Sequence, residues 1–340
     1  MRKPHVALSP KCISLIASCA MTMENVTVES RPAAWKTLLA FGIIYFVWGS
    51  TFLAIRIGVH EIPPLLFAAM RFGTAGAALL LWPVAKGERM PRGKEWLTLT
   101  VLAALIFLCD YGLLFWAEQR VPSGIAAVML ATIPAFMALS EIIFLRTQKL
   151  TIRLGVALLI GVGGVAVLMS RSLNLGGAPI DTKGALALLG ASVTWSIASA
   201  FPKMMAVPES KVVSSAMQML IGGLMLTVAA GGAGEFARFH PTDVSHVVWW
   251  ALSYLIVAGS IIGFTAYVWL LHHESPTKVG TYAYVNPVVA VIIGYCLGGE
   301  PLDARIVLGA AFVLVSVVVI TTSQVKKPEA VAAVAAKDAA

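Results

Sequence analysis

The second half of this chain repeats the pattern of the first half, and both halves are strongly apolar. Pro122 and Pro276 lie 154 positions apart, as do Gly155 and Gly309. Each of these prolines opens a long apolar stretch, and each glycine lies early in the next one. A duplicated and wholly hydrophobic half is typical of secondary transporters, whose substrate site lies where the two repeats meet.

The composition places the chain in a membrane. Hydrophobic residues make up 59% of the 340 positions and charged residues only 12%, whereas a soluble domain carries about 25% charged residues. The net charge of +8 is spread over short loops and forms no basic patch, so nucleic acid is not an expected partner. The partners that we expect are the lipid bilayer and a small-molecule substrate.

The sequence lacks the usual signatures of chemistry. It has no HExxH motif, no cluster of His, Asp and Glu, no CxxC spacing and no Walker A motif. We therefore predict no metal, no cofactor and no enzymatic activity, and ATP is not the expected energy source.

The apolar stretches are long enough to cross a bilayer, which takes about 20 residues in a helix. We expect ten such spans, near residues 36–56, 64–85, 97–117, 122–145, 153–170, 183–202, 212–230, 247–271, 276–298 and 304–323.

Orientation follows from the basic residues that flank the spans. Fifteen Lys and Arg fall on the side that also holds both termini, and six fall on the other side. Both termini are therefore expected in the cytoplasm. Because five spans per half is an odd number, the second half must enter the membrane upside down relative to the first.

These inferences define an expected fold class, an all-α membrane protein with ten transmembrane helices in two inverted-topology five-helix repeats. The expected domains are a disordered cytoplasmic leader over 1–35, a first repeat over 36–170, a second repeat over 183–323 and a cytoplasmic tail over 324–340. For the first 20 residues, a cleaved signal peptide and a start codon at Met21 or Met23 are the alternatives.

Several short motifs occur in order along the two halves. They are Trp48-Gly49-Ser50-Thr51-Phe52, Arg71-Phe72, Pro122-Ser123-Gly124-Ile125-Ala126-Ala127, Tyr282-Ala283-Tyr284-Val285-Asn286-Pro287-Val288 and Gly299-Glu300-Pro301-Leu302. Together they resemble the drug/metabolite transporter superfamily, and within it the EamA-type permeases. The resemblance implies efflux of small metabolites across the bacterial inner membrane, among them amino acids and their derivatives, nucleosides and toxic organic compounds. One position departs from the family pattern, because Thr147 stands where the first repeat would carry the counterpart of Glu300.

Three charged side chains, Arg71, Asp110 and Glu141, lie within predicted spans, where a charge costs about 2.5–3.5 kcal/mol on insertion scales. Glu141 is only four residues from the cytoplasmic end of its span and can extend to the surface. Arg71 and Asp110 each stand seven residues from the outer end of their spans, roughly 10 Å deep at 1.5 Å per residue, so we expect an Arg71–Asp110 pair. In the functional interpretation Arg71 binds an anion or gates the pathway and Asp110 carries a coupling proton. The alternative is an ion pair that only holds two helices together.

The middle of the membrane carries the other candidates. Pro134 and Pro287 are expected to break their helices there and to free backbone carbonyls that a cavity or a neighbour must satisfy. We expect the substrate pathway to be lined by Trp48, Ser50, Thr51, Arg71, Asp110, Thr132, Trp195, Tyr282, Tyr284 and Asn286. Ordinary helix packing is the alternative for each of them. The aromatic content suits a flat or apolar substrate, including one with a cationic group.

The expected function is secondary transport by alternating access, with protons or a counter-substrate as the coupling partner. A channel or a non-transporting membrane receptor is the alternative. Gly259-x-x-x-Gly263 and Gly294-x-x-x-Gly298 are interpreted as helix-packing surfaces, with a homodimer interface as the other reading.

Overall fold

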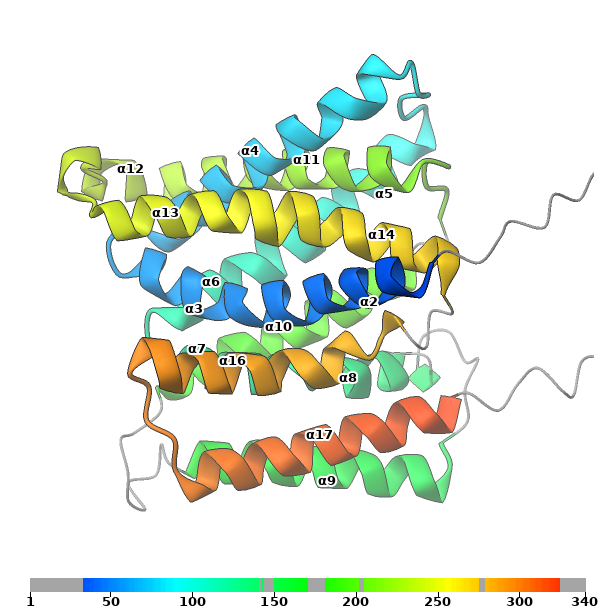
Figure 1. Ribbon diagram of the computed structural model, residues 1–340, viewed down its shortest axis with the longest axis vertical. Helices are drawn as coiled ribbons and strands as arrows, with labels where there is room; N and C mark the ends of the chain where they lie inside the picture. The colour runs from blue at the N-terminus through cyan, green and yellow to red at the C-terminus, as the bar shows by residue number, and fades with distance from the viewer. Residues whose placement is uncertain are drawn as a thin grey trace, which may run out of the picture.

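The computed structural model describes residues 33–140, 142–143, 150–170, 181–201, 205–274 and 279–324, and every regular element in those ranges is helical. Figure 1 shows long helices that run roughly side by side across the molecule. Helix α2 begins and α17 ends at the same end of this bundle (Figure 1). We call that end the proximal end and the opposite one the distal end.

The described residues of the first half form five long helical segments, some of which consist of consecutive helices. Their elements are α2 (Ala34–Gly42), η1 (Ile43–Val47) and α3 (Trp48–Val59); α4 (Pro64–Ala85); α5 (Lys94–Ala103), η2 (Ala104–Tyr111) and α6 (Gly112–Glu118); α7 (Ser123–Leu130) and α8 (Ile133–Ser140); and α9 (Ile152–Met169).

The second half follows the same order. Its elements are α10 (Thr182–Ala200); α11 (Lys211–Gly232), α12 (Glu235–Arg238) and η6 (Pro241–Asp243); α13 (His246–Tyr254), η7 (Leu255–Ile262) and α14 (Gly263–His273); α16 (Tyr282–Gly298); and α17 (Ala304–Gln324).

Length and composition identify membrane spans in this set. Within the described residues, six helices are long and apolar enough to cross a membrane: Ala34–Val59, Pro64–Ala85, Lys94–Glu118, Ser123–Ser140, Lys211–Gly232 and His246–Leu270. Three shorter apolar helices cover Ile152–Leu168, Tyr282–Gly298 and Ala304–Ile320. Many large apolar side chains on the outside of the bundle are exposed, as lipid-facing residues must be.

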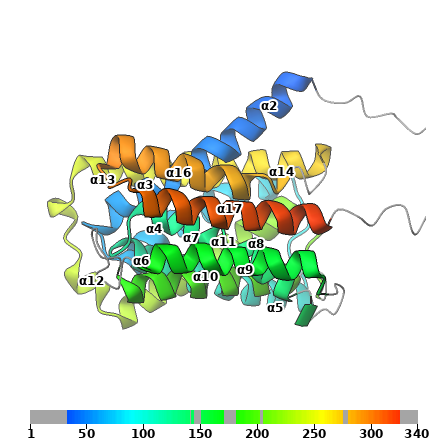
Figure 2. The same cartoon turned by 90° about the horizontal axis from the view of Figure 1, so that it is seen from below.

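Corresponding helices of the two halves pack against each other. Helix α4 lies along α11, and α9 lies along α17 (Figures 1 and 2). Glycines permit both contacts, because a Cβ at Gly223 would lie 2.5 Å from the backbone nitrogen of Gly73, and one at Gly164 would lie 2.9 Å from the carbonyl oxygen of Gly309. Close backbone approach through small residues is a usual way for helices to associate in lipid, where no hydrophobic effect drives them together.

The two mid-span prolines behave differently. The helix is interrupted between Leu130 and Ile133, immediately before Pro134, whereas α16 continues without interruption through Pro287. The prediction that both prolines break their helices is therefore wrong for Pro287. Because α16 packs against α3 and α7, the loss of one backbone hydrogen bond does not interrupt it.

Among the helices described in full, π-helical segments occur within three spans, which the sequence did not indicate. Segment η1 connects α2 to α3, η2 connects α5 to α6, and η7 connects α13 to α14. π-helical turns are rare in proteins, and those that do occur are often found at functional sites.

Candidate functional site

Two tryptophans that correspond in the two halves each contact a π-helical segment of the opposite half. The indole Nε1 of Trp48 donates a hydrogen bond of 3.0 Å to the carbonyl oxygen of Gly259 in η7. The ring of Trp195 in α10 lies edge-on to that of Tyr111 in η2, with 6.3 Å between ring centroids. These contacts join the two halves near the middle of the bundle.

Aromatic side chains from the second half surround Trp48. The centroid of the Tyr282 ring lies 5.1 Å from that of Trp48, and the centroid of Tyr267 lies 5.4 Å from it. Edge-on and tilted arrangements at these distances are the favourable geometries for aromatic pairs. Sequence reasoning selected Trp48 and Tyr282 but missed Tyr267, which has no counterpart among the short motifs.

Asn286 reaches the third π-helical segment. In the amide orientation that matches donors to acceptors, its side-chain nitrogen lies 3.2 Å from the carbonyl oxygens of Ile44 and Tyr45 in η1. It lies at the same distance from the carbonyl oxygen of Tyr282. Asn286 thus satisfies backbone carbonyls immediately before Trp48, as a polar side chain in the membrane must.

The hydroxyl groups of the predicted pathway divide into two sets. Ser50 Oγ lies 2.6 Å from the hydroxyl of Tyr254, and Thr51 Oγ1 donates to the carbonyl of Trp48, so both belong to the group around Trp48. Thr132 is buried and bonds Met129 O and Ser192. The hydroxyl of Tyr284 lies 3.5 Å from Val317 O in α17. The structure therefore does not bring Thr132 and Tyr284 into contact with Trp48.

Arg71 lies between these aromatic groups and is only 3% exposed. Its Nε donates to Ser260 Oγ at 3.1 Å, and its guanidinium carbon lies 4.7 Å from the ring centroid of Phe72 and 5.6 Å from that of Tyr111. Its Nη1 is buried and has no hydrogen-bond partner. Gly259 makes room for it, because a Cβ there would lie 3.3 Å from Nη2.

Asp110 is buried at 1% exposure, and its Oδ1 also has no partner. In the described part of the chain no ion pair joins it to Arg71, so the predicted Arg71–Asp110 pair is wrong. Arg71 instead donates to Ser260 Oγ and lies against the ring of Phe72. Depth along a span does not fix which way round the helix a side chain points.

At the distal end, a carboxylate links the two halves. Glu300 accepts hydrogen bonds from the backbone nitrogens of Ser123 at 2.6 Å and Gly124 at 3.0 Å, at the first turn of α7. The Nε of Arg56 lies 3.3 Å from Glu300 Oε1, and its Nη1 donates to the carbonyls of Glu118 and Val121. A carboxylate at a helix N-terminus satisfies free N–H groups and complements the helix dipole.

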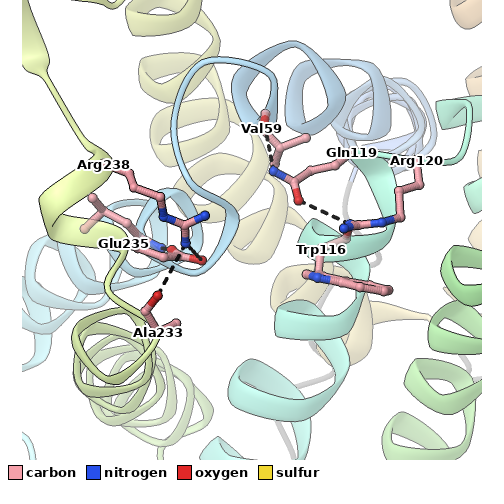
Figure 3. Close-up of polar contacts among 8 residues, drawn as sticks. Val59, Trp116, Gln119, Arg120, Ala233, Glu235 and Arg238 are labelled. Carbon is pink, nitrogen blue, oxygen red and sulfur yellow. Dashed lines mark hydrogen bonds and ion pairs between the residues drawn. The ribbon is translucent and has the colours of Figure 1, made fainter.

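Two further carboxylates at this end make the same kind of link. Glu235 accepts from the backbone nitrogen of Leu66 at 2.8 Å, in the first turn of α4. Glu61 accepts from the nitrogen and the hydroxyl of Ser245, at the start of α13. Figure 3 shows Glu235 with Arg238, beside the loop where Gln119 donates to the Val59 carbonyl. Burial raises the pKa of Glu235 above its usual range.

We call Glu61, Glu235 and Glu300 the distal carboxylates. Each belongs to one half and caps a helix of the other. Sequence reasoning missed this role, because a Glu in a loop gives no indication of a partner about 170 positions away or more. At the proximal end, the side-chain caps of α9 and α11 are local, supplied by Thr151 and Ser210. The counterpart of Glu300, Thr147, lies outside the described residues.

A crevice lies between the halves at the proximal end. Its volume is about 210 Å³, and its lining comes from the loop after α4, the start of α5 and the loop before α11: Glu88, Arg89, Glu95, Pro208, Glu209 and Ser210. Arg89 pairs with Glu95 at 3.2 Å, which is a contact within one half.

Comparison with known proteins identifies the class to which this chain belongs. It matches the EamA-like transporter family twice, over residues 34–170 and 182–322. The chain belongs to this family, as the sequence motifs predicted, and it is a membrane transporter.

Individual relatives of this chain are also described as transporters. The chain is 37% identical over 280 residues to the "Uncharacterized inner membrane transporter YedA" of Escherichia coli strain K12, a match that covers 82% of this chain and 88% of YedA. It is 25% identical over 280 residues to the "Uncharacterized transporter YoaV" of Bacillus subtilis, which covers 82% of this chain and 94% of YoaV. A solved structure described as "Crystal structure of protein" shares the fold, with a TM-score of 0.56 and 22% identity over 86% of this chain and 98% of that one.

Proposed function

We propose that this chain is a secondary transporter of the bacterial inner membrane that exports small metabolites by alternating access. The observation that carries this proposal is the pair of contacts made by the corresponding residues Trp48 and Trp195. Each reaches a π-helical segment in the opposite half. A site built in this way from both halves changes shape whenever the halves move relative to each other, which is what alternating access requires.

The proposed topology is ten spans in two inverted repeats, with both termini in the cytoplasm. The basic residues support this orientation, since fifteen lie on the side of the termini and six on the other. The packing of α4 on α11 and of α9 on α17, second with second and fifth with fifth in each half, is the pairing expected of two related repeats. In this topology the distal end faces outward.

The proposed substrate site comprises the aromatic and polar side chains around Trp48 and Arg71. Its members are Trp48, Ser50, Thr51, Arg71, Tyr111, Trp195, Ser260, Tyr267, Tyr282 and Asn286. Rings and hydroxyls predominate, which favours a flat and largely apolar compound.

The distal carboxylates are the proposed outer gate. To expose the site to the outside, the two halves must separate at the distal end, and the contacts of Glu61, Glu235 and Glu300 across the halves must then break. Their presence, together with the proximal crevice, supports a state that is closed to the outside. Asp110 is the proposed proton carrier, because it is a buried carboxyl group inside a span and its Oδ1 has no hydrogen-bond partner.

The test uses purified protein in liposomes that contain a trapped pH dye. Amino acids, nucleosides and aromatic cations are added in turn, and radiolabelled flux is measured in parallel. Saturable flux that shows counterflow, with a pH change in the lumen, is the expected result. Flux that rises linearly with concentration and shows no counterflow would establish a channel, and binding without flux would establish a receptor.

A further inference from the structure

We infer that the substrate of this transporter is an organic monoanion, a carboxylate with a flat apolar body, and that Arg71 binds its carboxylate group. This inference rests on the proposed function, because it names the substrate class of the same site. It is carried by the surroundings of one buried guanidinium.

Arg71 carries a permanent positive charge in an apolar environment. A guanidinium remains protonated in proteins, and this one is 3% exposed inside a span. Its described partners are all neutral: the Ser260 hydroxyl and the rings of Phe72 and Tyr111. Its Nη1, with two N–H donors, is buried without a partner. A buried cation in this situation lacks a directly paired counter-charge.

Within ion-pair distance, the described part of the chain does not supply that counter-charge. No ion pair in that part includes Arg71. Both carboxylate oxygens of Glu118 and the Oδ1 of Asp110 are buried without hydrogen-bond partners. In the described residues neither carboxyl group forms an ion pair with the guanidinium, and the charge of Glu118 acts on Arg71 only from a longer distance. A bound molecule would place a negative charge in direct contact with Nη1, which the described residues do not do.

The charge and shape of the ligand follow from the same neighbourhood. Arg71 is the one Lys or Arg well within a described span, so it can pair with one negative charge of a ligand, whereas the second charge of a dianion would find no cation there. A carboxylate matches the fork of N–H donors on a guanidinium. The rings that continue from Arg71 through Tyr111 to Trp195 offer flat apolar contact to the rest of the molecule.

The test compares acids with their uncharged amides. Full-length protein in detergent is titrated with indole-3-acetate, phenylacetate, indole-3-acetamide and phenylacetamide, and binding is measured by thermal shift and tryptophan fluorescence. Wild type is expected to bind each acid about tenfold or more tightly than the matching amide. In Arg71→Gln the preference should disappear, while Arg71→Lys, which keeps the charge, should retain part of it.

Arg120→Gln is the matched control, since Arg120 is exposed and stacks on Trp116 within its own half. Equal binding of acids and amides, an acid preference that survives in Arg71→Gln, or no binding of either acid would overturn the inference. Protection by chloride or sulfate alone would reduce Arg71 to an inorganic-anion site and overturn it as well. If Arg71→Gln does not purify as a monodisperse protein, the acid-to-amide ratio in Arg71→Lys decides.

Flux separates this inference from the proposed function. Arg71-dependent acid binding without flux in liposomes would leave the inference standing and refute the transporter proposal for this site. Saturable flux of neutral or cationic compounds that Arg71→Gln does not change would support the transporter proposal and refute the inference about Arg71.

Discussion

The indole nitrogen of Trp48 donates to the carbonyl oxygen of Gly259, 211 positions further along the chain. This single bond joins the first half to a π-helical segment of the second half, directly beside Arg71 and Ser260. In the proposed mechanism, substrate recognition and movement of the two halves therefore involve the same few side chains.

Removing the donor of that bond tests the central site. Trp48→Phe keeps an aromatic ring against Tyr267 and Tyr282 but loses the N–H, which costs about 0.5–1.5 kcal/mol in a typical case. We expect substrate affinity in counterflow assays to fall several-fold, and Trp48→Ala to lower it further without preventing membrane insertion. Asn286→Ala should behave like Trp48→Ala, because it removes the support of η1. Normal kinetics in Trp48→Ala and Asn286→Ala would rule out this site.

The outer gate is tested through Glu300. Glu300→Gln loses the ion pair with Arg56 and one of two acceptors for the α7 nitrogens, so the outward-open state should become more populated. A cysteine at Ser50, in a chain without its native cysteines, should then react several-fold faster with a membrane-impermeant thiol reagent added outside. Asp243→Asn is the control, since Asp243 lies exposed at the same end and its carboxylate accepts a hydrogen bond from the hydroxyl of its neighbour Thr242. Equal labelling rates in the two variants would mean that Glu300 is a structural cap.

Proton coupling is tested at Asp110. Asp110→Asn keeps the size of the side chain and removes its titration, so we expect transport driven by a pH gradient to stop while substrate exchange continues. The measurement is lumenal pH alongside radiolabelled flux. Unchanged coupling would assign Asp110 a packing role.

The contact between α4 and α11 predicts a steric effect. A methyl group at Gly223 would lie 2.5 Å from the backbone nitrogen of Gly73, so the helices must separate to admit it. Gly223→Ala should destabilise the protein by about 1–3 kcal/mol, seen as a lower unfolding midpoint in detergent. Gly232→Ala in the same helix, where no atom lies within 4 Å of the added carbon, should leave the midpoint nearly unchanged. Similar midpoints for the two variants would contradict the packing argument.

Much of the candidate site could be chosen from sequence, but its geometry could not. Trp48, Arg71, Trp195, Tyr282 and Asn286 were selected by depth and motif, and the structure gives each of them a contact across the halves or an unpaired buried group. The prediction of an Arg71–Asp110 pair was wrong because depth in a span does not define the direction in which a side chain points around the helix. The prediction of a helix break at Pro287 was wrong because the helices packed against α16 stabilise it.

The properties that depend on local composition could be predicted from the order of the amino acids. The apolar stretches, the repeat, the basic residues at one set of loops and the family all follow from neighbouring residues, because insertion in a bilayer depends on local hydrophobicity. Which groups meet depends on how the helices pack. Glu300 lies 177 positions from Ser123, and nothing in either segment specifies the other. Such contacts arise when packed helices bring their ends together, so the proposed gate and the unpaired charge of Arg71 are properties of the assembled bundle alone.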